Sequence, residues 1–189
     1  MYDGSNDNRY GVITDLAVQL QEREAQQFGK TALQKLIFLL QEVYKVDMGY
    51  HFGFYTYGPF AAELLNDLDF AQCIGAVTIE SADPAAGSGY RIQAGLMATD
   101  TMERASKFLT EHRGVINSLL DSFGKKSAKE LELLTTIIYL NKEVKPLDIS
   151  QSDAIRWIRE LKPRFTEHEV QSAIRELTTR HGIDLSFAA

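Results

Sequence analysis

The stretch KTALQKLIFLLQEVYKV, residues 30–46, constrains the fold most, because its apolar residues cover more than one side of a helix. A wide stripe at helical spacing is formed by Leu33, Leu36, Ile37, Leu40 and Tyr44. Phe38 and Leu39 extend the apolar surface beyond this stripe. A helix that is apolar on several sides must be covered by neighbouring elements. We therefore predict a central, buried helix that ends near Met48 and Gly49.

The patterns around this helix predict a mainly α protein with a small β-hairpin. In chain order we expect a helix over 10–26, the central helix, a short aromatic strand over 51–60 stopped by Gly58-Pro59, a helix over 60–75, and strands over 76–83 and 89–95. This order is typical of a winged helix, with residues 83–89 as the wing.

Residues 99–189 are predicted to be a helical extension. We expect helices over 99–123, 129–144 with Ser127 as its cap, 153–161 and 167–177, the last opened by a Thr166-x-x-Glu169 capping box. The domain organisation predicted is a flexible tail (1–9), a winged-helix-like core (10–98) and a helical extension (99–189) that packs on the core as one structural unit.

The charge of the chain is unevenly distributed. The net charge is −6, and residues 1–101 hold 6 Lys and Arg against 13 Asp and Glu. Between Val46 and Asp100, Arg91 is the one strong base. A surface that binds DNA makes about 6 to 10 phosphate contacts, so this half of the chain is a poor candidate for direct nucleic-acid binding.

Several classes of protein and site are disfavoured. No apolar run approaches the length of a membrane span, and the polar N-terminus does not resemble a signal peptide, so we expect a cytoplasmic protein.

The single cysteine, Cys73, excludes an internal disulfide and is expected to be buried. The Phe28–Thr31 stretch lacks the upstream glycine of a phosphate-binding loop, because Glu24 stands there. The four histidines have no metal-ligand spacing. We predict no catalytic residue, metal or cofactor, although a dispersed catalytic site would not be visible in the sequence.

The aromatic segment from Tyr50 to Tyr57 permits two interpretations. Its rings could form a stacking platform for single-stranded nucleic acid. Such platforms lie in positive grooves, however, and this segment has no Lys or Arg. A strand with one aromatic face in the core is therefore favoured.

The helix at the position of a recognition helix, AAELLNDLDF, is acidic. With Leu64, Leu65 and Leu68 directed inward, Glu63 and Asp67 fall four residues apart on the outer face, and Asp69 lies further round. Helices that read DNA present basic and amide side chains. Two interpretations remain: an ordinary solvated helix face, or a surface that binds the basic groove of a partner.

Two stretches together resemble a known group of proteins. Residues 33–68, with L-Q-K-L followed by Y-G-P-F, resemble the YwgA-like and SocA-like (Panacea) families. LELLTTIIYLNKEV and RELKPRFTEHEVQSAIREL are similar to the C-terminal part of YwgA-like proteins. The order of motifs resembles most the toxin-binding C-terminal domain of the DarTG antitoxin. The resemblance implies a role in toxin neutralisation or phage defence, by mimicry of DNA and without the enzymatic half of that antitoxin.

The leading hypothesis is therefore a non-enzymatic module that binds a partner protein, such as a toxin or a nucleic-acid enzyme, through an acidic surface. By the resemblance, the partner-binding positions are Tyr57, Gly58, Pro59, Glu63, Asp67 and Asp69. No membrane partner is expected, and a homodimer is left open. The alternative is a winged-helix transcriptional regulator, whose bases would be Lys125, Lys126, Lys129, Arg156, Arg159, Lys162 and Arg164.

Overall fold

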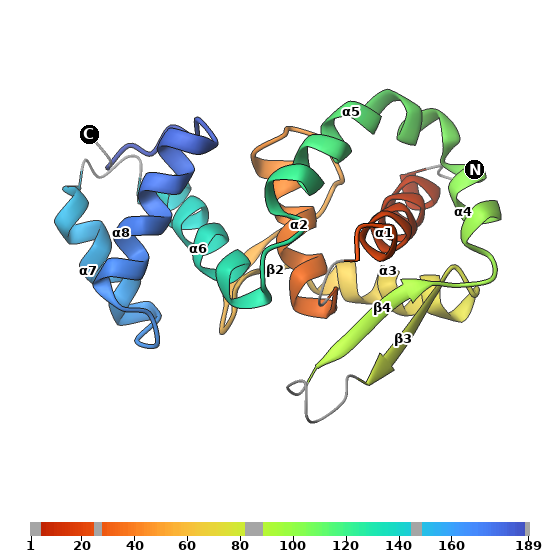
Figure 1. Cartoon of the computed structure of the whole chain (residues 1–189), viewed down its shortest axis with the longest axis horizontal. Helices are drawn as coiled ribbons and strands as arrows, with labels where there is room; N and C mark the ends of the chain where they lie inside the picture. The colour runs from red at the N-terminus through yellow and green to blue at the C-terminus, as the bar shows by residue number, and fades with distance from the viewer. Residues whose placement is uncertain (1–4, 25–27, 82–88, 145–148, 188–189) are drawn as a thin grey trace.

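The helix expected to be central, α2 (Lys30–Glu42), is enclosed by other elements in the computed structural model (Figure 1). Every residue from Ala32 to Leu40 is buried. The helix packs against α5, α6, strand β2 and strand β4. The prediction of a buried central helix is confirmed, although the helix ends at Glu42 rather than near Met48.

The structure describes residues 5–24, 28–81, 89–144 and 149–187. It is mainly helical, as predicted, with two small antiparallel β-hairpins where one was expected. The other elements are α1 (Ser5–Glu22), β1 (Gly53–Tyr55), β2 (Gly58–Phe60), α3 (Ala62–Cys73), β3 (Val77–Ser81), β4 (Tyr90–Ala94), α4 (Ala98–Arg104), α5 (Ser106–Phe123), α6 (Ala128–Val144), α7 (Gln151–Leu161), α8 (Glu167–Arg175) and a π-helical turn (Glu176–Arg180).

The aromatic segment forms a hairpin rather than the single strand expected. Strand β1 pairs with β2, with Gly53 opposite Phe60 and Tyr55 opposite Gly58. The chain reverses at Thr56 and Tyr57, and Gly58 adopts a φ of +85°, a conformation that favours glycine. Gly58 and Pro59 therefore belong to β2 instead of stopping a strand. In the second hairpin, Val77 to Ser81 pair with Ala94 to Tyr90. The predicted wing lies outside the described residues except for Gly89.

Two local expectations are wrong. Helix α1 begins at Ser5, so residues 5–9, expected in a flexible tail, are helical; residues 1–4 lie outside the described part. Arg9 in this first part of α1 donates hydrogen bonds to the carbonyl oxygens of Met48 (2.8 Å) and Gly49 (2.7 Å). Cys73 is exposed, because α3 buries Leu64, Leu68 and Ala71 and Cys73 is out of register with that face.

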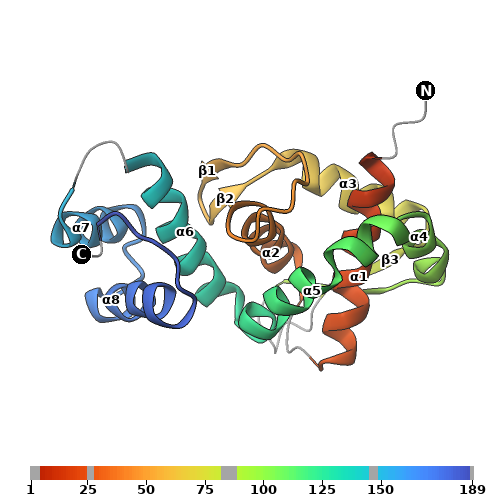
Figure 2. The same ribbon diagram turned by 90° about the horizontal axis from the view of Figure 1, so that it is seen from above.

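The C-terminal part is helical, and it packs on the rest through α4, α5 and α6. The expected helix over 99–123 is divided at Ala105, where α4 and α1 approach so closely that a Cβ on Gly11 would lie 2.2 Å from that of Ala105. Helix α5 contacts α1 and α2, and α6 contacts α2 and β2. Both views place the α7–α8 pair at one end of the molecule and α4 with the β3–β4 hairpin at the other (Figures 1 and 2). The Thr166–Glu169 capping box is present as predicted.

Within the described ranges, every helix is too short or too polar to cross a membrane. In the same ranges, no three side chains of His, Cys, Asp or Glu are placed to hold a metal ion together.

Candidate functional site

Two neighbouring polar residues of α2 hold the β1–β2 hairpin and the start of α3. The Gln34 side chain donates a hydrogen bond to the carbonyl oxygen of Ala61 (2.8 Å) and accepts one from its N–H (3.0 Å). The Lys35 Nζ donates to the carbonyl oxygen of Pro59 at 2.6 Å. The L-Q-K-L and Y-G-P-F stretches, which carry the resemblance, therefore contact each other directly.

Gly58 lies where a side chain would be strained and crowded. Its φ of +85° is strained for a side chain with a Cβ. A Cβ at this position would lie 2.9 Å from Thr136 Oγ1 and 3.8 Å from Lys35 Nζ. The glycine thus allows the hairpin to approach both α2 and α6 closely.

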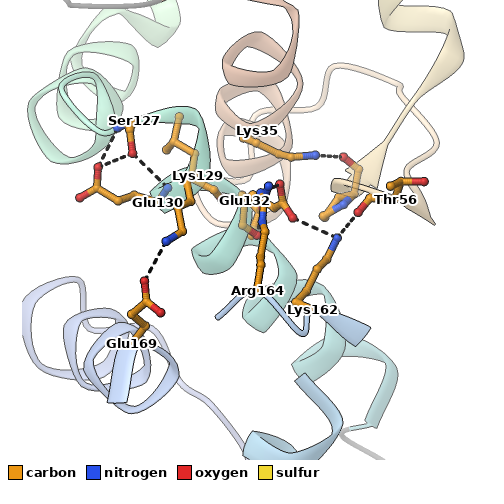
Figure 3. A network of polar contacts seen from close by, with 12 residues as sticks. Lys35, Thr56, Ser127, Lys129, Glu130, Glu132, Lys162, Arg164 and Glu169 are labelled. Atoms are coloured by element: carbon orange, nitrogen blue, oxygen red, sulfur yellow. Dashed lines mark hydrogen bonds and ion pairs between the residues drawn. The ribbon is translucent and has the colours of Figure 1, made fainter. Parts of the chain in front are cut away.

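A cluster of charged residues lies behind this hairpin, and we call Lys35, Glu132, Lys162 and Arg164 the Lys35 cluster (Figure 3). The first three are buried, and Arg164 is half exposed. Lys162 Nζ is 3.1 Å from Glu132 Oε1 and also donates to the carbonyl oxygen of Thr56. Arg164 Nη2 donates to Glu132 Oε2. The four residues come from α2, α6 and the segment that follows α7, so the cluster joins the core to the C-terminal helices.

The electrostatics of the Lys35 cluster are unusual. Burial lowers the pKa of Lys35 to about 8; the nearby Glu132 carboxylate opposes this shift and Lys162 adds to it. The side chains of Glu132 and Lys162 are 2% and 4% exposed. Beside them, Thr136 Oγ1 is buried and has no hydrogen-bond partner among the described residues. Such an orphan hydroxyl is uncommon in folded proteins.

A pocket of about 210 Å³ opens beside Lys35 on the hairpin side. Its lining is largely apolar and consists of Lys30, Thr31, Gln34, Lys35, Tyr55, Tyr57, Gly58, Phe60 and Leu65. The side chains of Tyr55 and Tyr57 are 66% and 56% exposed. Exposed tyrosines at the mouth of an apolar pocket are typical of a binding surface.

The structure brings three of the predicted site residues together at this hairpin. Tyr57 lies exposed at its turn, while Gly58 and Pro59 are buried in β2. Glu63 is exposed in the first turn of α3, directly after the hairpin. Asp69 is also exposed, and its carboxylate is 3.9 Å from Lys30 Nζ.

Asp67 does not lie on the open outer face, which corrects the prediction from helical spacing. Its side chain is 14% exposed, and its Oδ2 accepts a hydrogen bond from Tyr50 Oη at 2.7 Å. Arg9 Nη1 is 3.5 Å from the same oxygen. Burial and the Asp67 carboxylate raise the pKa of the Tyr50 hydroxyl. The reason for the error is that α1 and the segment before β1 cover this side of α3.

Most bases assigned to the alternative regulator are already engaged. Glu132 binds two of them, and the other pairs are Lys126–Glu176, Lys129–Glu169, Arg156–Asp153 and Arg159–Glu167. Of the seven, Lys125 alone has no such contact in the described part of the chain. These helices therefore present balanced charge rather than a basic stripe.

The sequence prediction missed Lys35, Glu132 and Thr136 as candidate site residues. A signal was present for the two charged residues, because each lies in an otherwise largely apolar stretch: Lys35 follows Gln34 in LQKLIFLL, and Glu132 lies in LELL. Charged residues are almost never fully buried unless they are paired. A charge inside such a run indicates a buried partner, but it does not say which residue that partner is.

No protein-family model matches the chain. No curated protein is detectably similar to it in sequence.

Proposed function

We propose that this chain is a cytoplasmic, non-enzymatic, antitoxin-like module that binds a partner protein through the β1–β2 hairpin and the outer face of α3. The observation that carries the proposal is the exposure of Tyr55 and Tyr57 beside an apolar pocket. Tyrosine is enriched among residues that dominate binding energy at protein interfaces. Burial of two such rings by a partner would remove a large apolar area from water.

The charge of α3, the helix that follows the hairpin, supports a basic partner, such as a toxin or a nucleic-acid enzyme. Helix α3 contains no Lys or Arg, and its Glu63 and Asp69 are exposed. Carboxylates at such a surface accelerate association with a positive groove and disfavour partners of like charge. They could occupy the positions that DNA phosphates take in that groove, which is the basis of DNA mimicry.

We also propose that residues 10–98 form a winged-helix-like core, because α1, α2, α3, β3 and β4 follow one another in that order.

The same order motivates the alternative of a DNA-binding regulator. The acidic outer face of α3 argues against it, since a carboxylate near a phosphate is repelled. Fluorescence anisotropy with duplex and single-stranded DNA at low salt tests the alternative: micromolar, strongly salt-dependent affinity would support the regulator.

The main experiment is affinity capture with the full chain, followed by elution with duplex DNA. We expect capture of a basic, DNA-binding protein that duplex DNA displaces. Charge reversal in Glu63→Lys/Asp69→Lys should weaken this capture by about tenfold or more. The matched control is Asp100→Lys/Glu103→Lys, which changes net charge equally at exposed positions on α4, away from the hairpin (Figure 1). An equal loss of capture in both variants would show that the change in net charge alone weakens binding, which would contradict the proposed surface.

A further inference from the structure

The Lys35 cluster holds more positive than negative groups. Glu132 forms ion pairs with the buried Lys162 and with Arg164, whose side chain is 47% exposed. The buried Lys35 ammonium is near the same carboxylate, but within the described ranges no acid forms an ion pair with it. A buried charge without a counter-charge is costly. The excess positive charge is therefore removed by loss of a proton from a lysine or balanced by an anion from outside.

Hydrogen bonding at Lys35 is also incomplete. An ammonium group carries three donors, and in the described part of the chain Lys35 uses one of them, toward the carbonyl oxygen of Pro59. Thr136 Oγ1, which like Lys35 Nζ lies within 4 Å of the position that a Cβ on Gly58 would take, has none of its bonds satisfied there. Unsatisfied buried donors favour a ligand that supplies acceptor oxygens.

The pocket gives an external group access to Lys35. Lys35 and Gly58 form part of its wall, and Tyr55, Tyr57, Phe60 and Leu65 form most of the rest. Lys30 also lines the pocket, but its ammonium is already close to Asp69 (3.9 Å). A dry cavity of about 150 Å³ can hold benzene, so a volume of about 210 Å³ is adequate for one aromatic ring with a small substituent.

We propose that this pocket binds a small apolar carboxylate, with the Lys35 ammonium bound to the carboxylate and the aromatic side chains packed on the apolar body. The carboxylate supplies both the negative charge and the acceptor oxygens that the buried lysine lacks. The aromatic walls disfavour a strongly hydrated anion such as free phosphate. The pocket shares Tyr55, Tyr57 and Gly58 with the proposed partner-binding surface, but carboxylate binding by Lys35 does not rest on the proposed function.

The direct test is an NMR titration of the labelled full chain with sodium benzoate at pH 7. Saturable shifts at the pocket-lining residues are expected. Benzamide, which has the same shape without the charge, should bind at least about tenfold more weakly, as should benzoate to Lys35→Met. Lys125→Met, which removes an exposed lysine without an ion pair, serves as the control and should bind like the wild type. Equal affinity for benzoate and benzamide would overturn the proposal.

A measurement on the wild type keeps the test valid if Lys35→Met does not fold. A bound carboxylate stabilises the Lys35 ammonium and so raises its pKa. Since burial holds the pKa of free Lys35 at about 8, benzoate affinity should fall above that pH, and binding at pH 9 should take up a proton. Calorimetry in two buffers with different ionisation enthalpies measures this uptake. Binding without proton uptake would contradict a contact with Lys35.

Two sources could supply the carboxylate: a free small acid, or the C-terminus of a polypeptide that ends in an apolar residue. A tripeptide ending in phenylalanine with a free carboxylate, compared with its amide, distinguishes them. Tighter binding of the free-acid peptide than of benzoate identifies a polypeptide end, and the reverse order identifies a free acid. If neither carboxylate binds saturably, the site does not have this function.

Discussion

Tyr50 Oη donates a 2.7 Å hydrogen bond to Asp67 Oδ2, and Arg9 Nη1 lies 3.5 Å from the same oxygen. The guanidinium of Arg9 also stacks over the Tyr50 ring, with 4.4 Å between Cζ and the ring centroid. This contact joins α1, the segment before β1 and α3. The acids of α3 therefore have two roles: Asp67 stabilises the fold, while Glu63 and Asp69 are exposed and accessible to a partner, Asp69 at 3.9 Å from Lys30 Nζ.

Charge reversal at Asp67 and at Asp69 should have different effects on stability. Asp67→Lys places a second cation against Arg9 in a half-buried site and leaves Tyr50 without its acceptor, so the free energy of unfolding should fall by about 3 kcal/mol or more. Asp69→Lys changes an exposed group, and an effect within about 1 kcal/mol is expected. Urea unfolding of the two single variants measures the difference. Similar losses in both would contradict the division of roles.

Gly58 should tolerate no side chain, whereas Gly53 in the same hairpin should. Gly58→Ala forces a Cβ into a φ of +85° and to within 2.9 Å of Thr136 Oγ1, so we expect a loss of about 2 kcal/mol or more. Gly53 has no atom within 4 Å of an added Cβ, and Gly53→Ala should change stability by less than about 1 kcal/mol. Thermal and urea unfolding of both variants provide the comparison, and a neutral Gly58→Ala would show that the hairpin can shift away from α6.

Lys35 should make stability depend on pH above neutrality. Burial lowers its folded-state pKa to about 8, while the unfolded chain retains the ordinary value of 10.5. Between these values the unfolded state binds more protons, so stability rises with pH across this window, by up to about 3 kcal/mol. Because other lysines and tyrosines also titrate here, the quantity to measure is the difference between wild type and Lys35→Met at pH 7, 8, 9 and 10. A constant difference would mean that Lys35 keeps an ordinary pKa.

Truncation of the exposed tyrosines should separate binding from folding. Tyr55→Ser/Tyr57→Ser removes two rings that are more than half exposed, so the free energy of unfolding should change by no more than about 1 kcal/mol. If the rings are interface anchors, partner affinity should fall by about thirtyfold or more. Leu96→Ser, at a fully exposed apolar residue outside the hairpin, is the control for general loss of surface hydrophobicity. Unchanged partner affinity in the tyrosine variant would show that the interface lies elsewhere on the molecule.

Sequence patterns predicted the helices well where the signal is local. The wide apolar stripe of residues 30–46 predicted a central helix, and the T-x-x-E pattern predicted the start of α8 at Glu167. The prediction failed where neighbouring segments decide the outcome. The hairpin at Gly58 approaches α6 closely, and α4 is divided from α5 at Ala105, which lies against Gly11.

The sequence by itself determined the positions of most helices, the acidic excess of residues 46–100 and the absence of bases on α3, because these follow from residue type and periodicity. Only the tertiary structure decided which acids face solvent. Helical spacing alone predicts that Asp67 faces outward, but in the structure Arg9 and Tyr50 cover it. It also assembled the Lys35 cluster. Lys35, Glu132 and Lys162 are far apart in the chain, and no local pattern determines which buried charges meet when α2, α6 and the segment after α7 pack together.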